Sequence, residues 1–142
     1  MTRGANETHR IKPPAAAHDR IGLLVVDDQL VYRQVAREVI EATDDFELLG
    51  YATRGEHALA AVEELEPDLV LLDVRMPGMD GIATAERLTS AYPDMTVVLI
   101  SIEEPPNLPG GITSCGAAAV VRKQDFAPAM LRRLWRAHGP SA

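Results

Sequence analysis

Five polar residues that could do chemistry together stand at, or just after, the ends of short apolar runs. These residues are Asp27, Asp28, Asp73, Ser101 and Lys123. Three carboxylates that are crowded together repel one another, and each raises the pKa of the others, unless a cation lies between them. Mg²⁺ suits such a group, because it takes oxygen ligands and is commonly held by one or two carboxylates plus phosphate oxygens.

The chemistry that such a group could support is phosphoryl transfer to a carboxylate. One carboxylate can attack phosphorus and form an acyl phosphate, while the metal and a lysine neutralise the oxygens in the transition state. Taken singly, each residue has an ordinary structural role, because an Asp-Asp pair usually belongs to a turn or a helix cap, and a lone lysine is usually a solvated charge. Their shared position at the ends of apolar runs favours a common site.

The elements that must position these residues alternate along the chain. Short apolar runs predict strands at 21–26, 46–51, 69–72, 96–100 and 118–121. Amphipathic stretches predict helices at 30–42, 53–66, 80–92 and 125–138. This alternation predicts an α/β fold with a parallel, doubly wound sheet that carries helices on both faces. Because ligands bind beyond the carboxyl ends of such strands, the five polar residues are expected to converge there.

Local signals set details of three predicted helices. In the first, Val31, Val35 and Val39 share one face at four-residue spacing. In the second, Thr53 to Glu56 has the pattern of a capping box, in which a hydroxyl and a carboxylate satisfy amides of the first turn. Asp80 is the expected N-cap of the third.

The motif residues together resemble the bacterial two-component response regulator receiver domain. The resemblance covers roughly residues 21–138 and depends on Asp27-Asp28, the segment 71–81 (LLDVRMPGMDG), Ser101 and Lys123. It implies a flavodoxin-like three-layer sandwich with a five-stranded sheet of order 2-1-3-4-5. It also implies a signalling switch rather than an enzyme.

The resemblance assigns a role to each residue of the motif. Asp73 would be the phospho-acceptor. A sensor histidine kinase or phosphotransfer protein would supply the phosphoryl group. Ser101 and Lys123 would contact the phosphoryl group. The ligands of a Mg²⁺ cofactor would be Asp27, Asp28, Asp73 and the backbone carbonyl of Arg75.

The sequence departs from the family pattern at three places. Val120 stands where the family often has an aromatic switch residue, and Gln124 follows Lys123 where the family commonly has a proline with a cis bond. The segment 103–111 (EEPPNLPGG) begins where a fourth helix is expected, and its prolines and glycines do not sustain a helix interior. We therefore expect a degraded fourth helix, either a short one starting near Ile112 or a mobile loop.

The composition of the chain limits its expected binding partners and cellular location. Its 142 residues carry a net charge of −7, which disfavours direct nucleic acid binding. No apolar run approaches the ~20 residues that cross a membrane, and one cysteine, Cys115, agrees with a reducing cytoplasmic location. The expected organisation is a disordered tail at 1–19 and a receiver domain at 20–139 that stands alone as a monomer or weak homodimer, with output through contacts to a downstream protein.

Three other functions compete with the phosphorylated switch. The chain could be a phosphorylation-independent pseudo-receiver that acts as an interaction module, or the receiver portion of a DNA-binding transcription regulator. An aspartyl phosphohydrolase is disfavoured, because Arg75 stands where such enzymes typically have a second aspartate. Trp135 on the last predicted helix either covers the edge of the core or contacts a partner.

Overall fold

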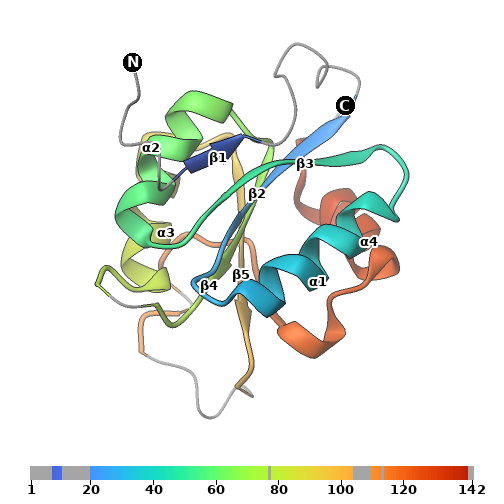
Figure 1. The fold of residues 1–142 in the computed structure, drawn as a ribbon. Helices are drawn as coiled ribbons and strands as arrows, with labels where there is room; N and C mark the ends of the chain where they lie inside the picture. The colour runs from blue at the N-terminus through green and yellow to red at the C-terminus, as the bar shows by residue number, and fades with distance from the viewer. Residues whose placement is uncertain (1–7, 11–19, 77, 104–109, 113, 141–142) are drawn as a thin grey trace.

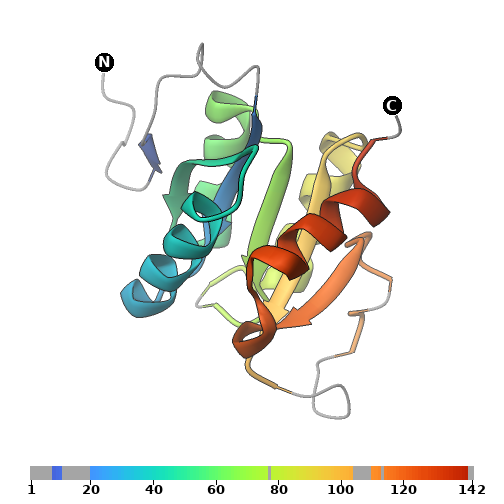
Figure 2. The same ribbon diagram turned by 90° about the vertical axis from the view of Figure 1, so that its right-hand side faces the viewer.

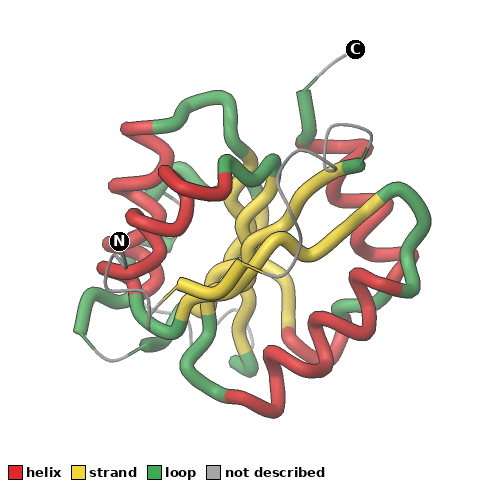
Figure 3. The backbone as a smooth tube through the Cα atoms, turned by 45° about the horizontal axis from the view of Figure 1, so that its top comes forward, coloured by secondary structure: helices red, strands yellow, loops and turns green. Residues whose placement is uncertain are grey.

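A twisted sheet with helices on both faces forms the centre of the structure (Figures 1 and 3). The coordinates are a computed structural model, which describes residues 8–10, 20–76, 78–103, 110–112 and 114–140. The strands are β1 (Thr8–Arg10), β2 (Ile21–Val26), β3 (Phe46–Ala52), β4 (Leu69–Asp73), β5 (Thr96–Ser101) and β6 (Ala119–Arg122).

Five of the strands are parallel and have the order β3-β2-β4-β5-β6, which confirms the predicted 2-1-3-4-5 topology. The register aligns their carboxyl ends. Val26 pairs with Leu72, Asp73 pairs with Ile100, and Ser101 pairs with Arg122. The residues that follow β2, β4, β5 and β6 therefore meet along one edge of the sheet.

Two pairs of helices cover the sheet. On one face lie α1 (Leu30–Glu41) and α4 (Pro128–His138), which stand in front of the strands in Figure 2. On the other face lie α2 (Gly55–Leu65) and α3 (Gly81–Ala91). Side chains of β2, β4 and β5 alternate between the two faces, so each helix pair closes its own buried cluster. This is the expected three-layer sandwich.

The first strand corrects the expectation of a disordered segment before residue 20. β1 pairs with β3 in the antiparallel sense, with His9 opposite Tyr51. The physical reason is that β3 would otherwise be an edge strand with free amides and carbonyls, and backbone pairing there requires no apolar pattern in the added strand. The rest of the predicted tail, 1–7 and 11–19, lies outside the described residues.

The region between β5 and β6 differs from the usual layout as the sequence indicated. The described parts of 102–118 contain no α-helix, and residues 110–112 form a turn. A short helix starting at Ile112 was therefore the wrong alternative, because Gly111 has a positive φ of 85° that interrupts helical geometry. Residues 104–109 and 113 lie outside the described part of the chain.

The helix ends and faces differ from the sequence analysis in two respects. The buried face of α1 consists of Tyr32, Ala36 and Ile40, whereas Val31 is 73% exposed. The capping box at residues 53–56 is not formed, because α2 begins at Gly55 with no side-chain cap. The predicted N-cap of α3 is confirmed, since the Asp80 side chain accepts a hydrogen bond from the Ala83 amide at 2.9 Å. No helix in the described part of the chain combines the length and apolar character needed to span a bilayer.

Candidate functional site

Asp27 and Asp28 leave the end of β2 in different environments. Asp27 is fully buried, and its amide donates a hydrogen bond to the Ala52 carbonyl at 3.0 Å, which continues the pairing with β3. The Asp27 Oδ1 atom accepts a hydrogen bond from the Gln29 amide at 2.8 Å, so the carboxylate is fixed by the turn into α1. Asp28 is exposed. This acidic pair therefore presents one rigid carboxylate and one that faces solvent.

Asp73 is the last residue of β4, and the turn into α3 shapes its surroundings. Its Oδ1 atom accepts a hydrogen bond from the Arg75 amide at 3.2 Å. The Gly81 amide donates to the Val74 carbonyl at 2.9 Å, which folds the start of α3 back against the strand end. A Cβ atom at Gly81 would overlap the Asp73 carbonyl oxygen, so this turn requires glycine.

The three carboxylates converge as the sequence predicted. One carboxylate oxygen from each of Asp27, Asp28 and Asp73 lies within 4.8 Å of the others. Hard oxygen donors at this spacing fit a divalent cation such as Mg²⁺. The predicted fourth ligand, the Arg75 carbonyl, belongs to the turn that follows Asp73.

Lys123 supplies the positive charge of the cluster. It begins the short 3₁₀ turn η4 (Lys123–Asp125) directly after β6, and its side chain is almost fully buried. The Nζ atom lies 2.7 Å from Asp27 Oδ2 and 3.4 Å from Asp73 Oδ2. A buried ammonium between two carboxylates offsets part of their mutual repulsion. Lys123 thus joins the site with its shorter contact to Asp27 rather than to Asp73.

The Asp73 carboxylate is electrostatically unusual. Burial, followed by the charge of Asp27, raises the pKa of Asp73 to about 6, against the opposing effects of Lys123 and the Arg75 amide. A pKa near 6 leaves Asp73 ionised at neutral pH, and a bound cation would favour that ionised form further. Perturbed pKa values of this kind cluster at functional sites.

Ser101 is buried at the end of β5, next to the acidic cluster in the register of the sheet. Its Oγ atom accepts a hydrogen bond from the Glu103 amide at 2.9 Å. Glu103 in turn forms an ion pair with Arg75, with 2.6 Å between Nε and Oε1. A chain of contacts therefore runs from Ser101 across the mouth of the site to the turn after Asp73.

Tyr32 is a site residue that the sequence analysis missed. Its ring lies on the buried face of α1, and the Lys123 Nζ atom is 4.6 Å from the ring centroid. Burial raises the pKa of the Tyr32 hydroxyl, and so do the charges of Asp27 and Asp73. Its spacing was a signal that could have found it, because Tyr32 comes four residues after Asp28, in the first turn of α1.

The two single-residue departures from the family pattern lie beside Lys123. Val120 is partly exposed on β6, and Gln124 is the middle residue of η4. The described chain contains no cis peptide bond, so the Lys123–Gln124 bond is trans. Lys123 reaches the carboxylates with this local geometry.

An apolar surface borders the site. Leu30 and Val31 are more than half exposed, and Val35, one turn further along α1, is 42% exposed. Large apolar side chains that gather on one exposed helix face are a common feature of protein contacts. We call these three residues the α1 apolar surface.

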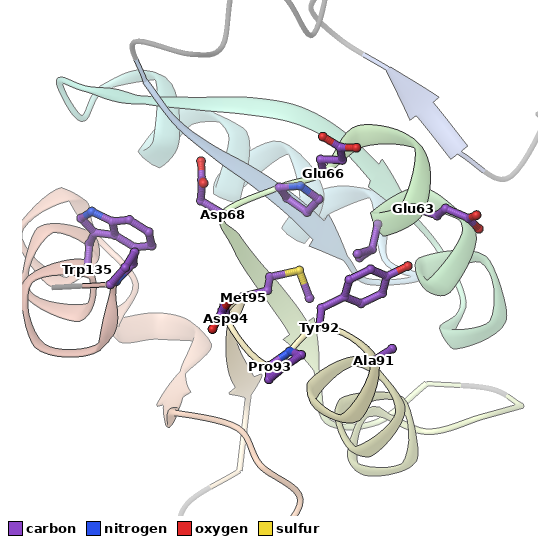
Figure 4. A pocket seen from close by; sticks show the side chains of 12 residues that line it. Glu63, Glu66, Asp68, Ala91, Tyr92, Pro93, Asp94, Met95 and Trp135 are labelled. Atoms are coloured by element: carbon purple, nitrogen blue, oxygen red, sulfur yellow. The ribbon is translucent and has the colours of Figure 1, made fainter. Parts of the chain in front are cut away.

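A hollow lies at the opposite end of the sheet from the carboxylates (Figure 4). It has a volume of about 590 Å³, and its lining includes Tyr92, Met95 and Trp135. Asp68 and Met95 in its lining precede β4 and β5, whereas Asp73 and Ser101 end these strands. Trp135 is half-buried against the core beside this hollow, so it covers an edge of the core, and the hollow is separate from the carboxylate cluster.

Comparisons with known proteins agree with this arrangement. Residues 23–134 match the family described as the response regulator receiver domain. The response regulator GacA of Pseudomonas viridiflava is 35% identical over 103 residues, which make up 72% of this chain and 48% of GacA. The chain thus spans about half the length of this relative.

Solved structures show the same fold. The signal receiver domain of the response regulator NarL from Mycobacterium tuberculosis superimposes with a TM-score of 0.76 at 27% identity, covering 84% of this chain and 97% of that one. The response regulator domain of Thermotoga maritima CheB gives a TM-score of 0.71 at 25% identity, covering 87% of this chain and 99% of that one.

Proposed function

Because the chain belongs to the response regulator receiver domain family, we propose that it is a phosphoryl-accepting switch that is phosphorylated on Asp73 in a Mg²⁺-dependent reaction. The observation that carries this proposal is the position of Asp73, which shares its site with Asp27, Asp28 and the Lys123 ammonium. The phosphoryl donor is a sensor histidine kinase or a phosphotransfer protein of a two-component phosphorelay, and the reaction takes place in the cytoplasm.

The residues that would hold the ion are Asp27, Asp28, Asp73 and the carbonyl of Arg75. When bound, Mg²⁺ supplies positive charge that stabilises the oxygens of the transferring phosphoryl group. The fit is supported by the spacing of the three carboxylates and by the fully buried position of Asp27. Asp27 is also held by the Gln29 amide, which keeps its second oxygen directed at the charges of the site.

The protein residues perform a simple displacement. An Asp73 oxygen forms a bond to phosphorus while the bond between phosphorus and the donor imidazole nitrogen breaks. The nitrogen keeps the electron pair and takes up a proton. Lys123, which is already 3.4 Å from Asp73 Oδ2, balances negative charge on the phosphoryl oxygens. Hydrolysis later returns Asp73 to a carboxylate and releases inorganic phosphate.

Ser101 would convert phosphorylation into a change of the surface. In the unphosphorylated protein its hydroxyl accepts from the Glu103 amide. A phosphoryl group on Asp73 offers the hydroxyl a charged acceptor, and a hydrogen bond to a charged group is stronger than one to a neutral group. Moving Ser101 toward that group would release the Glu103 amide and weaken the restraint on the Arg75–Glu103 ion pair. The output to a downstream protein would begin at this loop.

The α1 apolar surface is the proposed docking surface for the phosphodonor protein. Leu30 and Val31 follow Asp28 and Gln29 directly in the chain, so they border the acceptor site. Their exposure supplies the apolar area that a transient complex buries.

The decisive experiment is phosphorylation with a small donor. The protein is incubated with acetyl phosphate and Mg²⁺, and its intact mass is measured. The expected result is the added mass of one phosphoryl group, which is absent with EDTA and absent in Asp73→Asn. Asp94→Asn, which removes an exposed carboxylate at the opposite edge of the sheet, is the matched control and should be labelled like the wild type.

The same experiment separates the remaining alternatives. A protein that takes up no phosphoryl group from acetyl phosphate or from a histidine kinase would be the phosphorylation-independent interaction module. Repeated turnover of a phosphate ester would indicate a phosphohydrolase instead. Since the match covers only 48% of GacA, regulation of a DNA-binding partner domain is a further proposal that a phosphorylation-dependent DNA-binding assay on the natural full-length protein would test.

A further inference from the structure

The Tyr32 hydroxyl is a buried polar group that lacks a hydrogen-bond partner among the described residues. The side chain is only 8% exposed, so solvent does not readily replace the missing partner. The large majority of buried side-chain polar atoms are hydrogen-bonded, so an exception needs a physical reason. The hydroxyl therefore points to a group that is absent from the unliganded protein.

The surroundings of the ring place Tyr32 at the phosphoryl site. The Lys123 ammonium lies 4.6 Å from the ring centroid, in the geometry of a cation–π contact. The same ammonium lies 2.7 Å from Asp27 Oδ2 and 3.4 Å from Asp73 Oδ2. The Tyr32 ring therefore contacts the same ammonium that lies between the two carboxylates.

The two carboxylates are already engaged by other donors. Asp27 accepts from the Gln29 amide on one oxygen and faces Lys123 with the other. Asp73 accepts from the Arg75 amide on one oxygen and faces Lys123 with the other. A phosphoryl group on Asp73 would bring further oxygen acceptors into the space beside Lys123 and Tyr32.

We infer that Tyr32 is an additional residue of the phosphoryl site, whose hydroxyl donates a hydrogen bond to a phosphoryl oxygen on Asp73 and whose ring positions the Lys123 ammonium. The inference rests on the proposed function, because it assigns a partner that exists only after phosphorylation. It also makes α1 a part of the site, although none of the motif residues lies on that helix.

The test compares two variants at the same position. Tyr32→Phe removes the hydroxyl and keeps the ring, whereas Tyr32→Leu removes both. The probe is beryllofluoride with Mg²⁺, which mimics the phosphoryl group, and its dissociation constant is measured for each variant. One hydrogen bond to a charged group corresponds to an increase of roughly tenfold in this constant for Tyr32→Phe. Tyr92→Phe, a tyrosine at the opposite end of the sheet, is the matched control.

Two further readouts distinguish this role from a purely structural one. The affinity for Mg²⁺ alone should change less than about twofold in Tyr32→Phe, because the hydroxyl is assigned to the phosphoryl group and not to the metal. Labelling by acetyl phosphate should be slower in Tyr32→Leu than in Tyr32→Phe, since only the former loses the surface that holds Lys123. The urea midpoint of unliganded Tyr32→Phe should equal or exceed that of the wild type, because an unsatisfied buried donor is removed.

The outcomes separate this inference from the proposed function. If the wild type is labelled on Asp73 and Tyr32→Phe binds beryllofluoride as tightly as the wild type does, the hydroxyl has no such role and the proposed function stands. If the wild type is neither labelled nor binds beryllofluoride, the proposed function fails and the role of Tyr32 fails with it.

Discussion

At the scale of single residues, Lys123 is the internal counter-ion of an acidic cluster. Its 2.7 Å contact to Asp27 is shorter than its 3.4 Å contact to Asp73, so the unliganded site directs most of its positive charge to the buried carboxylate. A divalent cation among the same carboxylates would take over that task and free the ammonium for a phosphoryl group. We therefore expect Lys123 to affect both the stability of the resting protein and the proposed reaction.

Replacing Lys123 with Gln should destabilise the metal-free protein. Asp27 is fully buried, and the loss of its cationic partner leaves a buried carboxylate without compensation, at a cost of about 3 kcal/mol. Urea unfolding in EDTA measures this loss, and Mg²⁺ should restore more stability to the variant than to the wild type. Arg132→Gln on the exposed face of α4 is the control. Equal stability of Lys123→Gln and wild type in EDTA would contradict the counter-ion role.

Asp73→Asn should stabilise the metal-free protein at neutral pH. The pKa of Asp73 is raised to about 6 in the folded state, above its usual value of 3.8, so the folded state holds this proton more tightly than the unfolded state does. The proton on Asp73 therefore stabilises the folded wild type fully below about pH 4. This stabilisation is lost as the pH rises through about 6. The difference in unfolding free energy should reach ~2 kcal/mol at pH 7.5 and vanish toward pH 4. Urea unfolding in EDTA across this range is the measurement, and a pH-independent difference would refute the assignment.

At the scale of elements, the turn between β4 and α3 positions Asp73. Asp73 ends the strand, its own Oδ1 accepts from the Arg75 amide, and Gly81 brings the first turn of α3 against the strand. Sequence alone predicts this turn through the Asp80 N-cap and the glycine that follows it. The energetic demand for glycine becomes visible only when the Asp73 carbonyl is placed beside it.

Gly81→Ala should therefore disturb the fold and the site together. The added methyl group would overlap the Asp73 carbonyl and the Val74 Cα atom, and overpacking of this kind costs about 1–3 kcal/mol. Thermal unfolding measures the loss, and acetyl phosphate labelling should slow because the Asp73 backbone shifts. Gly110→Ala is the matched control, since nothing lies within 4 Å of its added methyl group. Labelling at the wild-type rate in a destabilised Gly81→Ala would show that the turn does not set the acceptor geometry.

A charge placed on the α1 apolar surface should weaken binding of the phosphodonor protein without changing the reaction at Asp73. Val31→Glu introduces a carboxylate at a side chain that is 73% exposed, so stability should change by less than about 0.5 kcal/mol. Phosphotransfer from a sensor histidine kinase that labels the wild type should slow by roughly tenfold, because an unpaired charge in an interface opposes association. Labelling by acetyl phosphate should remain at the wild-type rate. An equal loss with both donors would instead implicate the site itself.

Structural features that depend on a short stretch of sequence were predicted better than features that depend on distant contacts. Buried parallel strands were predicted well, because an uninterrupted aliphatic run as short as 69–72, bounded by polar residues, is typical of a strand covered on both faces. The valine pattern of α1 was only partly informative, because Val39 packs against the core whereas Val31 and Val35 are exposed beside the buried face that contains Tyr32. β1 was missed because backbone pairing requires no apolar pattern in the added strand.

The site itself was predicted more completely than its internal contacts. The convergence of Asp27, Asp28 and Asp73 follows from strand topology, and the coordinates confirm their proximity. The preference of Lys123 for Asp27 and the Ser101–Glu103 hydrogen bond depend on sub-ångström differences in side-chain position. No spacing in the sequence contains that information. The catalytic and metal-binding roles of these residues remain predictions.

At the scale of the whole molecule, the sheet separates two ends with different character. The carboxylates and Lys123 occupy one end, and the hollow beside Trp135 occupies the other. Trp135 is the only tryptophan, so its fluorescence reports on packing far from the acidic cluster. Trp135 fluorescence therefore follows global unfolding, and an ion bound at the proposed carboxylate site would not quench it directly.

Mg²⁺ should stabilise the whole domain through binding linkage. At a concentration 100 times its dissociation constant, the ion should raise the free energy of unfolding by about 2.7 kcal/mol. Urea unfolding followed by Trp135 fluorescence measures this, and chelation with EDTA should reverse it. Asp28→Asn, which alters an exposed carboxylate of the cluster, should lose much of the effect, whereas Asp94→Asn should retain it. Stabilisation of similar size in Asp28→Asn would place the ion elsewhere.

The short antiparallel strand β1 gives the sheet an asymmetry of its own. By pairing with β3 it becomes one edge of the sheet, so the two edges among the described strands are the three-residue β1 and β6. At the β6 edge, a polypeptide that paired with the free backbone groups would lie along the margin that ends in Lys123. A chain that added itself there would lie next to the residue that balances the site's charge, and on the far side of the molecule from its own amino-terminal strand.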